Sequence, residues 1–231
     1  MRDETCDVVV VGAGSAGCVL ANRLSADGRT RVLLLEAGPR DTNPWIHVPL
    51  GYGKLFARTD VNWAYESEPE PALNGRRVFT PRGKVLGGSS SINGLVYIRG
   101  QREDFDGWGV PGWGFDDLLP YFKKSEDQSR GADAWHGTGG PLAVSDLPDR
   151  HELCDAFIAS AEALGVPRNA DFNGAAQEGA GYYQATTRNG RRSSAATGYL
   201  RPAARRANLR IEVDALVTRV LFEGRQAVGV E

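Results

Sequence analysis

Residues 7–36 read DVVVVGAGSAGCVLANRLSADGRTRVLLLE, and this stretch decides the fold. Residues 7–11 are apolar and β-branched without alternation, which is typical of a strand buried on both faces of a parallel sheet. Residues 18–26 place apolar side chains at helical spacing, and Gly28 can end that helix in a left-handed conformation. Residues 31–36 have the pattern of a second buried strand. The stretch therefore predicts a complete βαβ unit and an α/β fold.

Three glycines, Gly12, Gly14 and Gly17, lie where the first predicted strand passes into the helix. In the GxGxxG pattern the first glycine permits a tight turn, and the second lets a pyrophosphate approach the backbone. The third lets the helix pack closely against the strand. Ser15 and Ala16 complete the turn at the helix N-terminus, where free amides favour phosphate groups. These five residues are candidate contacts of a dinucleotide.

Glu36 and Ala37 follow the second predicted strand, and Glu36 lies 19 residues after Gly17. A carboxylate at this position can bind ribose hydroxyls and would repel the extra phosphate of NADP. Strand, glycines, helix, second strand and acid fall in register, which predicts a Rossmann-type dinucleotide site. The pattern alone does not choose between FAD and NAD, and a glycine-rich turn without a ligand is the alternative.

Composition excludes several classes of protein. The 231 residues include 27 basic and 29 acidic side chains, a net charge of −2, so no basic excess indicates nucleic-acid binding. Cys6, Cys18 and Cys154 are too few and too widely spaced for a disulfide framework or a zinc site. We therefore expect no metal site, and we expect a reducing compartment. The longest early apolar run, Val8–Val11, predicts neither a signal peptide nor a membrane span.

Further along the chain, the many prolines of residues 38–82 predict an excursion with little regular structure. Helices are expected at residues 115–125, where Pro120 indicates a kink, and at residues 150–165. The second helix has Leu153, Phe157, Ala161 and Leu164 on one face. Three alternating segments predict a β-meander near the end: 209–213, 216–222 and 226–231.

Residues 83–106, GKVLGGSSSINGLVYIRGQREDFD, resemble the first signature of the glucose–methanol–choline (GMC) family of flavin oxidoreductases. The match covers the glycine–lysine start, the double glycine, the serines, the asparagine and the late acid. The resemblance extends over the whole chain through GAGSAG, LEAGP, NWAYESEPEP, HGTGGPL, DFNG and NGRRSSAATGYL. Within the family the chain is most similar to FAD-dependent alcohol dehydrogenases and choline dehydrogenases. The resemblance thus implies FAD.

The glycine–serine loop has the residue types that such a ligand needs. Gly87 and Gly88 let the backbone pass close to the flavin, Ser89 and Ser90 add hydroxyl donors, and Asn93 can donate and accept. The resemblance implies FAD contacts, largely through the backbone, at Val85, Gly88, Ser89, Asn93, Gly94, Leu95, Val96 and, on a late strand, Val217. Some family oxidases attach FAD through a histidine where this chain has Ile92. Non-covalent FAD is therefore implied.

The resemblance also implies a division into domains and a reaction. The expected parts are 1–140, the first part of the FAD-binding domain; 141–192, a substrate-domain excursion; and 193–231, an incomplete second part of the FAD-binding domain. The implied reaction oxidises the CH–OH group of a primary alcohol, with hydride passing to the flavin and then to a non-nicotinamide acceptor such as a quinone. The implied location is cytoplasmic, and peripheral contact with the inner face of the membrane is left open.

No catalytic residue is assigned from the sequence. The family's base is a histidine near the C-terminus of a chain more than twice this length, so we expect this chain to end before it. His47, His136 and His151 show no recognisable pair or orienting carboxylate. Three alternatives therefore stay open: a choline dehydrogenase, a truncated non-catalytic fragment that holds FAD, and an NAD-binding regulator.

Overall fold

The structure is a computed structural model that describes residues 5–231. Residues 1–4, part of the N-terminus at which no signal peptide is expected, lie outside the described residues. The chain forms two compact units: unit 1 comprises the residues up to Gly94 together with Gly190–Glu231, and unit 2 is Leu95–Asn189. Unit 2 therefore begins well before the expected domain boundary at residue 141. The assignment of the two parts to FAD and substrate stays a prediction.

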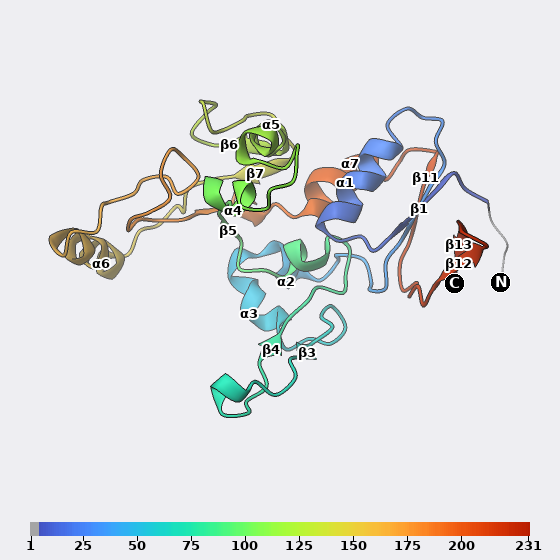
Figure 1. Cartoon of the computed structure of the whole chain (residues 1–231), viewed down its shortest axis with the longest axis horizontal. Helices are drawn as coiled ribbons and strands as arrows, with labels where there is room; N and C mark the ends of the chain where they lie inside the picture. Colours follow the sequence, from blue (N-terminus) through green and yellow to red (C-terminus); the bar gives the residue numbers. More distant parts are fainter. Residues whose placement is uncertain (1–4) are drawn as a thin grey trace. The chain divides into compact units, whose positions relative to one another are not determined.

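Unit 1 is built on a parallel three-stranded sheet (Figure 1). Its strands are β1 (Val8–Val11), β2 (Val32–Leu35) and β11 (Leu209–Glu212), in the order β1-β2-β11. Helix α1 (Ser15–Leu24) connects β1 to β2, which run parallel to each other. The predicted βαβ unit and the α/β fold class are confirmed.

The predicted three-stranded meander is wrong. Strand β11 pairs in parallel with β2, and only β12 (Val220–Glu223) and β13 (Gln226–Val230) form an antiparallel hairpin. Alternation reports which side chains are buried and not which strand is the partner, so the pattern could not assign β11 to the sheet. The segment expected from residue 216 becomes a strand only at Val220, and Val217 therefore lies in a connection.

The core of unit 1 lies between the sheet and helices from both ends of the chain. Cys18 and Ala21 of α1 pack with residues of η4 (Ala196–Leu200), a π-helical turn, and α7 (Arg201–Ala203). The Asn22 side chain donates a hydrogen bond of 2.7 Å to the Tyr199 carbonyl and thereby fixes this packing. Burial raises the pKa of the Cys18 thiol to about 12, so the thiol stays neutral inside the core.

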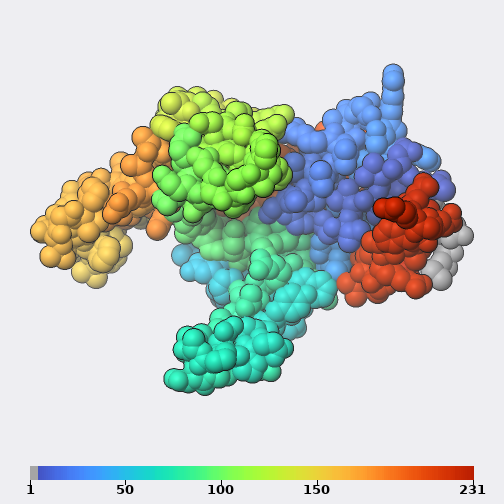
Figure 2. All heavy atoms as spheres, viewed as in Figure 1, coloured from blue at the N-terminus to red at the C-terminus, as the bar shows by residue number. Residues whose placement is uncertain are grey.

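The rest of unit 1 consists of short elements, as the prolines predict. They are α2 (Pro44–His47), η1 (Pro49–Gly51), α3 (Tyr52–Leu55), β3 (Tyr65–Glu66), η2 (Pro71–Leu73), β4 (Phe79–Thr80), η3 (Gly88–Ser91) and β10 (Arg191–Arg192). Five buried side chains hold them together: Ile46, Leu55, Val61, Val85 and Ile92. The β3–β4 hairpin projects from this unit, and its residues 68–79 are all exposed (Figure 2).

Unit 2 has two small pairs of strands and three helices. Its elements are β5 (Val96–Tyr97), α4 (Arg102–Asp106), α5 (Phe115–Ser125), β6 (Glu126–Gln128), β7 (Leu142–Val144), α6 (Glu152–Ala163), β8 (Gln184–Ala185) and β9 (Thr187–Arg188). Strand β5 pairs with β8, and β6 pairs in parallel with β7. These pairings bring early and late residues of 95–189 together, which explains why the unit is larger than the expected excursion.

The two helices predicted in this region are both present. Helix α5 has the predicted bounds and contains Pro120. Helix α6 is shorter than predicted, and its Leu153 and Phe157 side chains are 70% and 71% exposed, whereas Ile158 is buried. Gly165 follows α6 with φ +88°. Within residues 5–231 no helix has the length and apolar character that crossing a membrane requires.

The sheet core of unit 1 leads to a stability prediction. Leu34 is fully buried in the middle of β2, so Leu34→Ala should lower the free energy of unfolding by about 2–5 kcal/mol. The matched control, Leu50→Ala, changes a leucine that is 90% exposed and should alter stability by less than about 0.5 kcal/mol. Urea unfolding followed by circular dichroism measures both. Equal effects of the two substitutions would contradict the assigned core.

Candidate dinucleotide-binding site

The first glycine turn has a geometry that only glycine permits at two of its positions. Gly12 has φ +87°, and its amide donates a hydrogen bond of 2.7 Å to the Leu35 carbonyl, which anchors the turn to the sheet. A Cβ atom at Gly17 would lie 1.9 Å from the Gly12 carbonyl oxygen, so α1 packs directly on the turn. Around Gly14 the space is open. The tight turn at Gly12 and the close packing at Gly17 agree with the GxGxxG spacing. The role of Gly14 toward a pyrophosphate stays a prediction.

The N-terminus of α1 is accessible. No side chain caps it at Gly14, no acidic residue lies in its first turn, and Ser15 and Ala16 are exposed. The first amides of a helix have no partner within the helix, and the helix dipole makes this end positive. The end of α1 therefore has the properties of an anion-binding position, and a diphosphate has the charge that fits it.

Glu36 connects the first turn to the segment after β2. The carboxylate is 5% exposed, and its two oxygens accept hydrogen bonds from the amides of Ala13 (2.7 Å) and Gly38 (3.0 Å). Each oxygen keeps a second lone pair. Glu36 therefore positions backbone on both sides, and Ala37 beside it is half-buried. The predicted contact of Glu36 with ribose hydroxyls remains compatible with this geometry and untested.

The second glycine turn lies directly against the first. The Gly87 amide donates a hydrogen bond of 2.7 Å to the Ala13 carbonyl. Gly88 has φ +54°, and a Cβ atom on it would lie 2.7 Å from the Gly14 Cα. The two turns thus form one surface made of main chain, as the hypothesis of a single shared ligand requires.

The serines after Gly88 mainly stabilise their own turn. Ser89 Oγ accepts a hydrogen bond from the Gly83 amide (3.1 Å). Ser90 Oγ donates to the Gly87 carbonyl (2.6 Å) and accepts from the Ala195 amide (3.0 Å). The expectation that Ser90 offers its hydroxyl as a donor to the ligand is therefore wrong, because that hydrogen is used within unit 1. A ligand contact of Ser89 stays a prediction.

Arg192 holds the end of the second turn, and the sequence analysis missed it. Its guanidinium is buried and donates to the Ile46 carbonyl (2.7 Å), the Ser90 carbonyl (3.2 Å), and both Oδ1 (2.6 Å) and the carbonyl (2.8 Å) of Asn93. Burial lowers the pKa of Arg192 to about 10, which still leaves the side chain cationic at neutral pH. The motif NGRRSSAATGYL was the available signal, but it does not show which arginine is buried.

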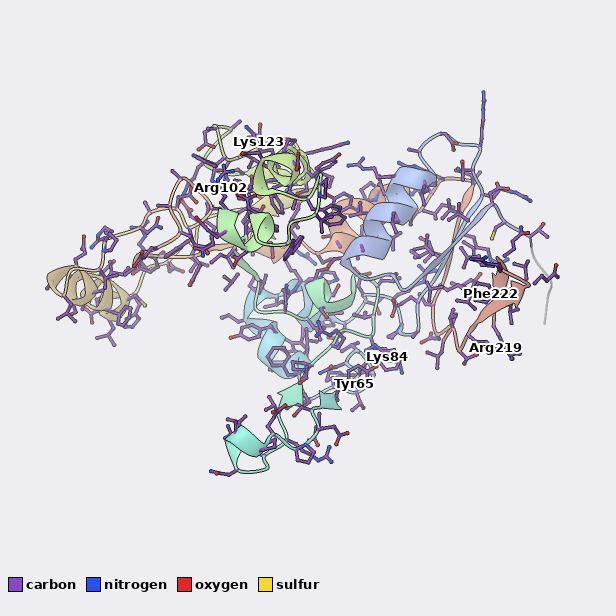
Figure 3. The ribbon with its side chains drawn as sticks, viewed as in Figure 1. Tyr65, Lys84, Arg102, Lys123, Arg219 and Phe222 are labelled. Atoms are coloured by element: carbon purple, nitrogen blue, oxygen red, sulfur yellow. The ribbon has the colours of Figure 1, made fainter. Side chains whose placement is uncertain are left out.

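An aromatic stack lies at the approach to the second turn. The rings of Trp63 and Tyr65 are parallel within 6° with centroids 5.8 Å apart. Lys84 Nζ lies 4.9 Å from the centroid of the Trp63 ring, directly before Val85 in the chain. Figure 3 labels Tyr65 and Lys84 in this region. The stack fixes the chain that enters the glycine–serine loop.

Comparison with known proteins identifies the family. The GMC oxidoreductase family matches residues 6–231. The chain belongs to the GMC oxidoreductase family. It is 52% identical over 228 residues to an alcohol dehydrogenase (acceptor) of Pseudomonas putida and 46% identical over 228 residues to an oxygen-dependent choline dehydrogenase of Sinorhizobium fredii. These alignments cover 97% of this chain, which spans 41% of the length of each relative.

The solved structures agree with this assignment. An FAD-dependent oxidoreductase from Chaetomium thermophilum superposes with a TM-score of 0.89 at 31% identity, over 98% of this chain and 41% of that one. The chain therefore has the fold of the N-terminal portion of an FAD-binding GMC oxidoreductase. The resemblance recognised in the sequence and the flavoprotein class are confirmed.

The remaining residues implied by the GMC resemblance fall into different environments. Val85 is fully buried with its side chain in the cluster around Ile46, so only its backbone can face a ligand. Gly94 is exposed, and a Cβ atom there would meet nothing within 4 Å. Val217 was expected on a strand but lies half-buried in the connection after β11. Two residues before it, the Ala215 amide donates to the Glu36 carbonyl, which places this connection beside the end of β2.

Leu95 and Val96 belong to unit 2, and the structure describes them there. Leu95 is buried with φ +65°, a left-handed conformation that is strained for a leucine, and its carbonyl accepts from the Thr186 amide (2.9 Å). Val96 is 53% exposed in β5. Their predicted contacts with FAD remain predictions.

The three histidines have different burial and different hydrogen-bond partners, which the sequence did not indicate. His47 Nε2 lies 2.7 Å from the Asp41 carbonyl, and the His151 ring accepts from the Leu153 amide at the start of α6. His136 is buried, with Glu126 and Asp171 at its two ring nitrogens. The expectation that no orienting carboxylate accompanies a histidine is wrong for His136, because both partners are distant from it in sequence.

The two packing environments of the first turn predict different effects of a glycine-to-alanine change on stability. Gly17→Ala should lower the free energy of unfolding by about 1–3 kcal/mol, because its Cβ would overlap the Gly12 carbonyl and force the backbone to shift. Gly14→Ala should change stability by less than about 0.5 kcal/mol, since the space there is open and its φ is −72°. Thermal unfolding without added ligand compares them, and a larger loss for Gly14→Ala would refute the described turn.

Proposed function

We propose that this chain forms the flavin-holding part of an FAD-dependent oxidoreductase that oxidises the CH–OH group of a primary alcohol. The observation that carries the proposal is the contact between Gly14 and Gly88 beside the uncapped start of α1. A surface made of main chain lets a large planar ligand and its diphosphate approach closely. The relatedness to an alcohol dehydrogenase (acceptor) supports the class of substrate.

Each part of the candidate site has one task in this proposal. The amides of Gly14, Ser15 and Ala16 bind the diphosphate at the positive end of α1. Glu36 binds ribose through its remaining lone pairs while it holds Ala13 in place. The turn at Gly88, followed by Ser89, Asn93, Gly94, Leu95 and Val96, contacts the flavin, and Val217 contacts the adenine edge. FAD, when bound, supplies the acceptor of hydride from the alcohol carbon.

We further propose that FAD is held without a covalent bond. Ile92 occupies the position at which some family oxidases have the attaching histidine. Its side chain is 2% exposed inside the cluster around Ile46 and Val85, and it carries no nucleophilic atom. FAD should therefore leave the protein completely on acid precipitation.

The relatedness to an alcohol dehydrogenase (acceptor) supports the proposed class of substrate and a separate electron acceptor. The proposed substrate is a primary alcohol, and the proposed electron acceptor is a quinone-like molecule. The proposed location is the cytoplasm, and contact with the inner face of the membrane is left open. Choline is the second candidate substrate, because the chain is also 46% identical to an oxygen-dependent choline dehydrogenase. We assign no catalytic base among residues 5–231 and place it in the part of the longer relatives to which this chain has no counterpart.

Binding of FAD tests the site directly. Gly14→Ala should weaken FAD binding at least about tenfold, which corresponds to 1.4 kcal/mol, because its Cβ projects into the space proposed for the diphosphate. The matched control is Gly53→Ala, an exposed glycine of α3 that also has open space around it and should leave binding unchanged. Quenching of flavin fluorescence on titration gives both affinities.

The nicotinamide alternative gives a different result in the same experiment. Binding of NAD in place of FAD would support a nicotinamide-binding regulator and overturn the proposal. Retention of FAD without oxidation of a primary alcohol or choline, assayed with an artificial electron acceptor, is the result expected of this chain alone, because its base is proposed to lie outside residues 5–231; a non-catalytic flavin-binding chain gives the same result. Turnover by the chain alone would contradict the placement of the base outside residues 5–231.

A further inference from the structure

Four charged or titratable side chains gather inside unit 2, and none of them is among the residues proposed above to bind FAD. They are Arg99, Glu126, His136 and Asp171. Glu126 is fully buried, Arg99 and His136 are nearly so, and only the Asp171 side chain keeps partial exposure, at 29%. The proposed flavin chemistry does not use this cluster, so we consider its role within unit 2.

The contacts of His136 define its protonation. Nδ1 lies 3.0 Å from Glu126 Oε1, and Nε2 lies 2.8 Å from Asp171 Oδ2. A carboxylate accepts hydrogen bonds and does not donate them, so both ring nitrogens must carry hydrogen to satisfy both partners. This is the imidazolium form.

The balance of charge points the same way. Glu126 and Asp171 bring two negative charges, and Arg99, whose Nη2 lies 2.8 Å from Glu126 Oε2, brings one positive charge. A protonated His136 makes the cluster neutral, whereas a neutral His136 leaves an excess negative charge in the interior, which is costly. Burial alone would lower the pKa of His136, but the hydrogen bonds to the two carboxylates outweigh it and raise the pKa above its ordinary value of 6.5.

Other groups that surround the ring do not reverse this balance. Gln128 Nε2 on β6 lies 3.2 Å from both Nδ1 and Glu126 Oε1, and the Gly137 amide donates to Glu126 Oε2. Asp133 Oδ1 accepts from the His136 amide, and Lys123 Nζ at the end of α5 donates to the Asp133 carbonyl. Asp133 and Lys123 carry opposite charges, and neither side chain bonds to the His136 ring in these contacts. The two carboxylates at the ring therefore dominate.

Asp171 is the first residue of a loop that lines a cavity. Asp171 Oδ1 accepts from the Asn173 amide (3.0 Å), and Asn173 Oδ1 accepts from the Arg99 amide (2.7 Å). Gln177 Nε2 donates to the Arg99 carbonyl (2.7 Å). Residues 172–178 form one wall of a cavity of about 270 Å³ whose other walls include Arg99, Phe115 and Trp135. Asp171 is therefore one of the points that fix this wall, besides the bonds of Asn173 and Gln177 to the Arg99 backbone.

We propose that His136 is a proton-dependent latch that holds the loop of residues 171–178 against the buried Glu126–Arg99 pair. In its imidazolium form His136 joins the loop to β6 through one ring. Loss of the Nε2 or Nδ1 hydrogen removes one of the two bonds and leaves the cluster with an excess negative charge. The start of the loop at Asp171 is then released, because Asp171 is the partner nearest to water. The latch does not depend on the proposed flavin function.

The direction of the pH effect follows from the raised pKa of His136. A group whose pKa is higher in the folded than in the unfolded protein stabilises the fold fully below the unfolded value, here 6.5. That stabilisation disappears as the pH rises through the higher folded value. The loop should therefore be held at Asp171 in mildly acidic solution and released once the pH exceeds the raised pKa of His136.

The titration of His136 tests the latch. The chain has three histidines, so ¹³C and ¹⁵N imidazole NMR signals can be assigned from the variants His47→Gln and His151→Gln. In the unaltered chain His136 should titrate above 6.5. In Asp171→Asn its midpoint should fall by about one pH unit or more, because one of the two neighbouring charges is removed. A midpoint at or below 6.5, or one that Asp171→Asn leaves in place, would overturn the proposal.

The loop provides a second readout in case Asp171→Asn alters the NMR spectra broadly. Hydrogen exchange of the peptide amides of residues 171–178, corrected for the intrinsic effect of pH, should rise with pH through the His136 midpoint. In Asp171→Asn it should be fast at every pH. The matched control Asp155→Asn removes a carboxylate of unit 2 that bonds to Tyr182, outside the cluster, and should leave the exchange of the loop unchanged. Loop protection that Asp171→Asn does not alter would refute the latch.

Discussion

The candidate site depends on a contact between two pieces of main chain that carry no side chains. Gly14 and Gly88 are so close that a methyl group on Gly88 would overlap Gly14, and the Gly87 amide bonds to the Ala13 carbonyl. A side chain at Gly88 would separate the two turns, since interiors do not absorb extra atoms without strain. The first turn lies at the carboxyl end of β1 in the parallel sheet, and the second turn follows the proline-rich segment of residues 38–82.

Two buried charges hold these turns in position, although most of the surrounding chain has no regular structure. Glu36 accepts from one backbone amide of the first turn and one of the segment after β2, and Arg192 donates to four acceptors around the end of the second turn. A buried charge is tolerated when hydrogen bonds satisfy it, and it then specifies one arrangement of its partners. Irregular segments thereby gain the precision that helices and strands obtain from their own ladders of hydrogen bonds.

The sequence predicts those helices, strands and turns that a local pattern of residues encodes. The apolar run of β1 and the glycine spacing before α1 each report their own neighbourhood, and those two elements were predicted correctly. The partner of β11, the burial of Arg192 and the carboxylates around His136 arise from contacts between distant residues. No periodicity records such contacts. The family resemblance supplied FAD, but it did not show that the Ser90 hydroxyl is used internally.

The start of α1 has no side-chain cap, unlike the starts of α2 and α6. Asn43 caps α2, His151 caps α6, and the first amide of α5 bonds to Asp106. Relative to glycine, a capping side chain typically contributes only about a few tenths of a kcal/mol, which α1 forgoes at Gly14. A serine or aspartate at Gly14 would recover that stability, but its side chain would fill the open space in front of the amides. Stability lost at this one helix end is consistent with an anion that completes the cap when it binds.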